Sequence, residues 1–128
     1  YKTLPSPYMV KLYDMPSLFA GKIHVVICRG WKNRVKGRDL YDYVFYISKQ
    51  AKVNLHHLQA RLEDSGVWRE GEILTLEKLQ ELLYNRFEQI DYNQAKKDVM
   101  PFITDVHKLE CWSKEFFIDI SQNLQTAE

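Results

Sequence analysis

Hydrophobic residues recur every three to four positions over most of this chain, a spacing typical of helices that bury one face. The clearest stripe starts after Thr75 and continues to about Ile90, and it consists of Leu76, Leu79, Leu82, Leu83 and Phe87. The same period predicts further helices over residues 14–28, 39–49, 54–65, 96–106 and 113–121. We therefore expect a mainly α fold, a compact bundle of five to six helices.

One segment alternates between apolar and polar side chains with the period of two that favours a strand. It spans Tyr8–Tyr13 and follows the prolines at positions 5 and 7, which favour extended backbone before them. We predict one short N-terminal β-strand here. Residues 122–128 are expected to fray, as chain ends commonly do.

Composition bounds the size and the class of the protein. A chain of 128 residues that is 45% hydrophobic suffices for one core, so residues 1–128 are expected to form a single helical domain. It contains no run of 18 apolar residues and no signal-peptide pattern. Cys28 and Cys111 form no CxxC pair and lie in apolar surroundings, so we predict buried free thiols and a reducing, cytoplasmic location.

Charge is distributed unevenly, although the net charge is only +1. Residues 1–52 carry 10 Lys and Arg against 3 Asp and Glu, whereas residues 53–128 carry 8 against 14. In the segment 22–42, the cations that precede the first acid are Lys22, Arg29, Lys32, Arg34, Lys36 and Arg38. Such a tract favours an anionic partner. We therefore expect the chemistry of this chain to lie in that segment.

Lys22 interrupts an apolar helical run and has two interpretations. At about 100° per residue, it shares one helical edge with Leu18, Val25 and Arg29. A lysine among apolar side chains either extends its ammonium group into water or meets an anion. The first is common for long side chains. The second would make Lys22 a phosphate-contacting residue, with Arg29 available to the same anion.

Asp39 and Asp42 follow the basic tract at a spacing of three residues, and Gly37 is a natural break before them. In a helix that begins near Arg38, both carboxylates would project from the same side of the first turn. Asp39 could simply cap that helix, because acidic side chains accept hydrogen bonds from the unpaired N–H groups there. Alternatively, the two acids could help hold a metal ion or orient a polyphosphate bound by the cations.

These residues carry a resemblance to a known enzyme family. The stretch 12–47, with its Ala20-Gly21-Lys22 and Arg38-Asp39-x-x-Asp42 elements, is similar to the AbiEii/AbiGii-type nucleotidyltransferase toxins. These are bacterial type IV toxin–antitoxin proteins linked to abortive infection, within the DNA polymerase β-like nucleotidyltransferases. The family's Gly-Gly-x-Ser turn and Asp-x-Asp metal-binding pair are not present in this sequence. The chain therefore resembles the C-terminal portion of a longer enzyme, and alone it is expected to be inactive.

The resemblance implies a role for each matching residue. Lys22 would be the catalytic lysine that contacts phosphate, and Asp39 would be the catalytic acid that orients Lys22 or a metal-bound water. The residues expected to support substrate binding are Asp42, Arg38, Arg29 and Lys36. The longer protein would use Mg²⁺ and a nucleoside triphosphate, with no metal ligand assigned in this chain and no tight binding by it. Implied partners are an N-terminal nucleotidyltransferase domain of the same chain, a cognate antitoxin and an RNA acceptor, but no membrane.

A second interpretation involves no catalysis. A helical module could bind nucleic acid or a protein partner through the basic tract, which would explain the cations equally well. It would explain neither Lys22 among apolar neighbours nor the pair formed by Asp39 and Asp42.

Overall fold

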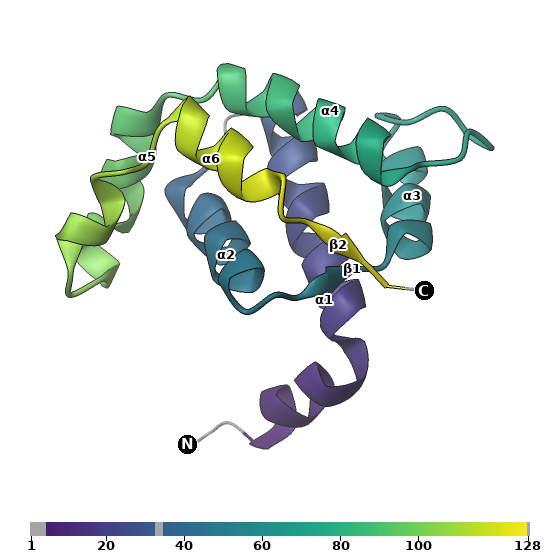
Figure 1. Ribbon diagram of the computed structural model, residues 1–128, viewed down its shortest axis with the longest axis horizontal. Helices are drawn as coiled ribbons and strands as arrows, with labels where there is room; N and C mark the ends of the chain where they lie inside the picture. The colour runs from purple at the N-terminus through teal and green to yellow at the C-terminus, as the bar shows by residue number, and fades with distance from the viewer. Residues whose placement is uncertain (1–4, 33–34, 128) are drawn as a thin grey trace.

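The structure, a computed structural model, describes residues 5–32 and 35–127 (Figure 1). Along the chain, the elements are α1 (Pro5–Lys32), α2 (Gly37–Ser48), β1 (Lys52–Val53), α3 (Leu55–Asp64), α4 (Leu76–Glu88), α5 (Tyr92–Val99), the 3₁₀ helices η1 (Met100–Phe102) and η2 (Val106–Leu109), α6 (Lys114–Ser121) and β2 (Gln125–Thr126). The fold is mainly α, as predicted. No helix in the described ranges is long and apolar enough to cross a membrane.

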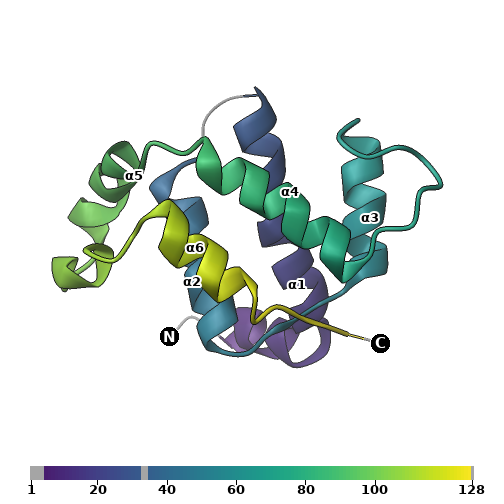
Figure 2. The ribbon, with the colours of Figure 1, turned by 45° about the horizontal axis from the view of Figure 1, so that its top comes forward.

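The core lies between α1 and the helices that pack on it. On α1, the completely or almost completely buried positions follow the helical period and are Phe19, Ala20, Ile23, Val26 and Ile27. Helices α4 and α6 lie side by side across the bundle (Figure 2). Tyr43 of α2, Phe87 of α4 and Phe117 of α6 form an aromatic cluster with ring centres 5.2 to 6.4 Å apart. This cluster joins α2 to the pair of helices that covers it.

The start of α2 is fixed by α5. The backbone N–H of Gly37 donates a hydrogen bond of 2.8 Å to Oδ2 of Asp98. A Cβ atom at position 37 would lie 2.0 Å from the carbonyl oxygen of Ala95, so a residue larger than glycine would displace one of the two helices. The close approach of the two backbones therefore sets where α2 begins, and with it where Asp39 and Asp42 lie.

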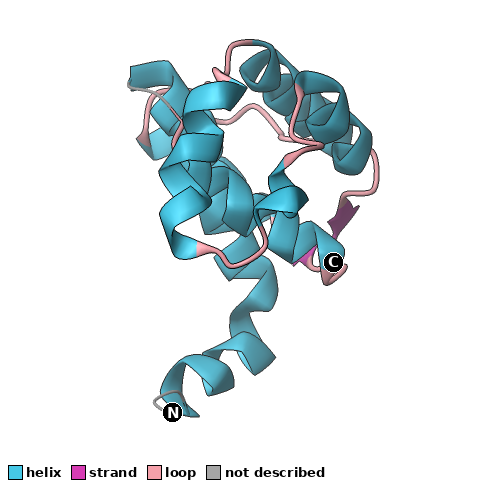
Figure 3. Ribbon diagram, turned by 90° about the vertical axis from the view of Figure 1, so that its left-hand side faces the viewer, coloured by secondary structure: helices cyan, strands magenta, loops and turns pink. Residues whose placement is uncertain are grey.

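The strand predicted over Tyr8–Tyr13 is wrong, because these residues form part of α1. An alternation over six residues is too short to separate the two periods, and a strand needs a partner that the segment lacks, since β1 and β2 pair with each other. α1 begins at Pro5 and contains Pro16, a residue that lacks the N–H group of a regular helix. Its ribbon changes direction, and its first turns extend away from the bundle (Figure 3).

The C-terminal segment is ordered differently from the prediction. Instead of fraying, β2 pairs in parallel with β1, and the N–H of Ala127 donates to the carbonyl of Val53 at 2.9 Å. Leu124, which precedes β2, is only 5% exposed. Burial of this leucine and the backbone pairing together offset the entropy that a free end would keep. Glu128 lies outside the described residues.

Two smaller predictions also need correction. The helix expected over 96–106 begins earlier and ends at Val99, where Pro101 leads into a short 3₁₀ turn. Both cysteines are free, as predicted, but Cys111 is exposed rather than buried, while Cys28 is partly buried. Trp112, the apolar neighbour of Cys111 in the sequence, is buried, whereas Cys111 itself is not.

Candidate functional site

Lys22 reaches from α1 to α2, where it meets Asp42. The Lys22 Nζ donates to Asp42 Oδ2 at 3.0 Å, and each of the two side chains is 42% exposed. The two interpretations of Lys22 therefore both apply, because its ammonium group contacts an anion and also keeps access to water. An ion pair with this much exposure contributes about 0 to 1 kcal/mol to stability.

Two helical turns after Lys22 on α1, Arg29 forms an ion pair with Asp39 of α2. The Arg29 Nη1 lies 3.2 Å from Oδ1 and 3.1 Å from Oδ2 of Asp39, whose side chain is only 12% exposed. The backbone N–H of Lys36 also donates to Asp39 Oδ2, at 3.1 Å. The interpretation of Asp39 as a helix cap is thus confirmed, since its carboxylate accepts a hydrogen bond from the residue before the first turn of α2.

Together the two pairs form what we call the seam, the contact of Lys22 and Arg29 with Asp42 and Asp39. The earlier cation on α1, Lys22, contacts the later acid on α2, and the later cation, Arg29, contacts the earlier acid. The two helices therefore run antiparallel here. Both cations lie on one edge of α1, within about 20° of each other. Among the ion pairs of the described residues, Lys22 is joined to Asp42 rather than to Asp39. The acid that Lys22 contacts is therefore Asp42, whereas Asp39 was expected to orient either Lys22 or a metal-bound water.

A cavity adjoins the seam. It has a volume of about 230 Å³, and its lining residues are Arg38, Tyr41, Asp42, Val99, Phe102 and Ile103. The Arg38 guanidinium lies 5.6 Å from the centre of the Phe102 ring, in cation–π contact. Asp42 thus belongs both to an ion pair and to a cavity wall, and a cation and an anion face the same space.

Outside the seam, the described side chains of the basic tract are those of Lys36 and Arg38. Lys36 is exposed immediately before α2. Arg34 and the side chain of Lys32 lie outside the described residues. Of the six cations in the tract, the structure therefore brings two to the carboxylates of α2 and a third, Arg38, to the cavity.

Comparison with known protein families gives a match over most of the chain. Residues 2–120 match the family described as nucleotidyl transferase AbiEii toxin, type IV toxin–antitoxin system. The chain belongs to the AbiEii family. No curated protein and no solved structure matches it significantly.

Membership in the AbiEii family raises the question whether the side chains of this chain can hold a metal ion by themselves. Among the described side chains, which belong to residues 15–29 and 35–127, no group of three or more His, Cys, Asp or Glu is arranged to hold a metal ion. Asp39 and Asp42 are each bonded to a cation. The donors of the described AbiEii chain therefore do not fit a divalent cation on their own, since such ions need several oxygen ligands.

Sequence reasoning missed two contacts near this AbiEii site. One is the bond from Gly37 to Asp98, because residues 61 positions apart give no periodic signal. The other joins α1 to the end of α3, where His24 Nε2 lies 2.6 Å from Ser65 Oγ. Burial, and then the nearby Arg61 guanidinium, lower the pKa of His24. His24 was visible in the sequence only as one polar residue in an apolar run.

Proposed function

We propose that this AbiEii chain contributes the phosphate-contacting lysine and an acidic residue to a metal-dependent nucleotidyl-transfer site. In such a reaction, an acceptor oxygen forms a bond to the α-phosphorus of a nucleoside triphosphate, the bond to the β-phosphate breaks, and pyrophosphate leaves. Lys22 would offset the negative charge that develops on the phosphate oxygens. The observation that carries this proposal is the half-exposed pair of Lys22 with Asp42 beside the cavity lined by Arg38.

Between the two acids, the contacts favour a division of labour. Asp39 is 12% exposed and bonded to Arg29 and to the backbone of Lys36, so its role would be to position α2 and Arg29. Asp42 is more exposed and lines the cavity, so it would be the acid closer to substrate and to Lys22. Arg38, Arg29 and Lys36 would bind the polyphosphate or an RNA backbone.

The rest of the site would come from other parts of a longer protein. Gly-Gly-x-Ser and Asp-x-Asp elements in an N-terminal domain would cradle the phosphates and supply the Mg²⁺ ligands that the described residues lack. Mg²⁺ would supply charge stabilisation at the triphosphate. The type IV toxin–antitoxin family suggests a cognate antitoxin as a partner. The coding sequence that precedes Tyr1 is expected to encode both elements, and their absence from it would refute the proposal.

The decisive experiment measures transfer of labelled nucleotide by the longer protein. Lys22→Ala is expected to abolish transfer while leaving the melting temperature nearly unchanged, because the ion pair is half exposed. Lys78→Ala is a matched control, since Lys78 is 44% exposed and pairs with Glu72 at 3.7 Å, far along the chain from the seam. Full transfer by a folded Lys22→Ala protein would show that Lys22 has no catalytic role.

The alternative, a non-catalytic module that binds nucleic acid, is favoured by one observation. Arg38 of α2 lies over the ring of Phe102, and Lys49, which follows α2, lies over the ring of Phe45; both rings are well exposed. Exposed cations beside aromatic rings can bind single-stranded nucleic acid by charge and stacking. On this alternative, Lys36→Ala and Arg38→Ala would each weaken RNA binding and flatten its salt dependence by about one unit of slope, while Lys22→Ala would leave transfer unaffected.

A further inference from the structure

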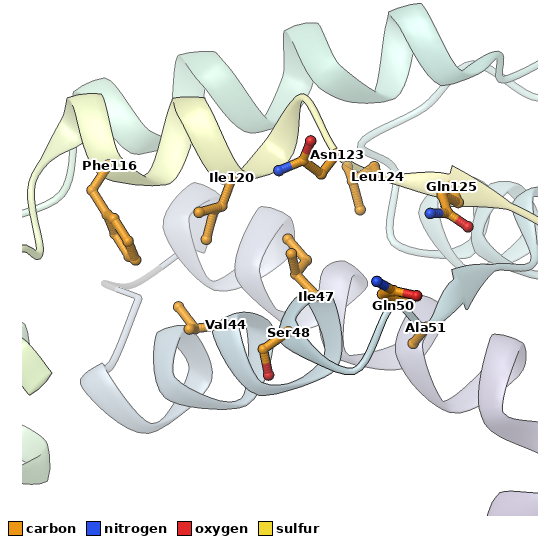
Figure 4. A pocket seen from close by; sticks show the side chains of 10 residues that line it. All are labelled: Val44, Ile47, Ser48, Gln50, Ala51, Phe116, Ile120, Asn123, Leu124 and Gln125. Atoms are coloured by element: carbon orange, nitrogen blue, oxygen red, sulfur yellow. The ribbon is translucent and has the colours of Figure 1, made fainter.

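A second cavity lies on the other flank of α2. It has a volume of about 500 Å³ and is formed by the C-terminal half of α2, by α6 and by the segment that leads into β2 (Figure 4). Its lining residues Val44 and Ser48 lie about 160° and 120° around the helix from Asp42. This cavity, which we call the amide cavity, is therefore separate from the seam, and the proposed function does not use it.

The two ends of the amide cavity differ in chemistry. One end is walled by apolar side chains from α2 and α6, namely Val44, Ile47, Phe116 and Ile120 (Figure 4). The other end carries three carboxamide side chains, those of Gln50, Asn123 and Gln125, which approach it from both sides (Figure 4). None of the described lining residues is charged. A ligand for this space would be uncharged, with one apolar surface and one edge that forms hydrogen bonds.

Gln50, Asn123 and Gln125 are exposed to solvent, so their carboxamides are available to such a ligand. Among the described residues, no side-chain hydrogen bond engages Gln50, Asn123 or Gln125. Each carboxamide offers a carbonyl acceptor and two N–H donors. Three of them at one end of a cavity can therefore recognise a ligand edge that has both donors and acceptors.

Gln50 also occupies an unusual backbone conformation. Its φ is 59°, and it directly follows Lys49, the C-terminal cap of α2. Glycine is the usual residue at this position of a helix end, because a side chain there is strained. A glutamine in this conformation costs conformational energy, which is explained if its carboxamide serves the cavity.

We propose that the amide cavity binds the base of a nucleoside. A flat base could lie against Phe116 and the aliphatic wall, while the carboxamides bond to its polar edge, as glutamine and asparagine commonly do with base edges. The volume lies within the range of about 300 to 1,000 Å³ for small-molecule sites. Because no charged side chain lines the cavity, it recognises the base rather than the phosphates.

Binding is tested by following the ¹H–¹⁵N spectrum of the 128-residue chain during titration with adenosine, cytidine, guanosine or uridine. At least one nucleoside is expected to shift the side-chain amide signals of Gln50, Asn123 and Gln125 saturably, and ribose alone is expected to leave them in place. If no nucleoside produces a saturable shift, the proposal fails. It also fails if N-methylacetamide produces the same shifts, because the cavity would then recognise a peptide group.

Substitutions separate loss of the site from loss of the fold. Gln50→Gly is expected to weaken nucleoside binding by about two- to tenfold, the effect of one hydrogen bond, and at the same time to raise the melting temperature by removing the strained conformation. Asn123→Ala is expected to weaken binding by a similar factor. Asn85→Ala, an exposed asparagine on α4, is the matched control and should bind normally. Unchanged binding by both Gln50→Gly and Asn123→Ala would overturn the proposal.

Discussion

Two faces of α2 are built for different purposes. Toward α4 and α6, Tyr43 joins a cluster of completely buried aromatic rings, and its hydroxyl lies 2.6 Å from that of Ser121. Toward α1, Asp39 and Asp42 form ion pairs that keep contact with water. Burial of apolar surface dominates stability, whereas exposed ion pairs contribute little. The comparison teaches that the cluster holds α2 in place, so the half-exposed pair of Lys22 with Asp42 needs an explanation other than stability.

The largest effect is expected from the cluster. Phe87→Ala removes a completely buried ring that contacts Tyr43 and Phe117, and it is expected to lower the free energy of unfolding by about 3 to 5 kcal/mol. Chemical denaturation measures this loss. A loss below about 1 kcal/mol would show that the surrounding helices close the space, and that the cluster is not the main anchor of α2.

An intermediate effect is expected where α2 begins. Gly37→Ala would place a Cβ atom 2.0 Å from the Ala95 carbonyl oxygen, so α5 must shift, at a cost of about 1 to 3 kcal/mol or more. Hydrogen exchange is expected to accelerate in α5 and in the first turn of α2, but not in α3. Normal exchange in α5 would contradict the close approach of the two backbones.

A smaller effect should distinguish the two acids. Asp39→Ala loses an ion pair and the bond to the Lys36 N–H, so a loss of about 1 kcal/mol is expected. Asp42→Ala loses one half-exposed pair, and a loss below about 0.5 kcal/mol is expected. Thermal denaturation of the two variants gives the comparison. Equal losses would mean that Asp42 is as structural as Asp39.

The smallest effect concerns pH. The pKa of His24 is lowered by folding, so the unfolded chain binds its proton more readily than the folded chain does. Stability from this group is therefore present above its unfolded pKa, 6.5, and is lost as pH falls below that value. His24→Gln is expected to lose less stability than the wild type between about pH 7.5 and pH 5. Identical pH dependence in the two proteins would show that His24 does not titrate differently on folding.

The sequence predicted what depends on neighbours along the chain. The stripe from Leu76 to Phe87 lies in α4, and Leu79, Leu83 and Phe87 are completely buried, because helical period alone decides which face is apolar. The sequence also showed that Lys22 and Arg29 share one helical edge and that Asp39 and Asp42 share the side of another helix. It did not show that Lys22 pairs with Asp42 and Arg29 with Asp39.

The rest depends on contacts between distant residues. Asp98 reaches Gly37 across 61 positions, and only the packing of α5 on α2 brings them together. The alternation over Tyr8–Tyr13 was misleading, since six residues fit a helix as well as a strand when no partner strand is at hand. The amide cavity combines residues from α2, α6 and the end of the chain, so no local motif could have indicated it.

The parallel pairing of β1 with β2 has a consequence for the order of folding. It joins Lys52 to Gln125 and so closes a loop of about 70 residues. Closing such a loop has an entropic cost that two short strands cannot offset alone, so the pairing is expected to follow the packing of α3, α4 and α6. The strand pair would then be a late step, one that secures the segment after α6 only once the helices between the two strands are in place.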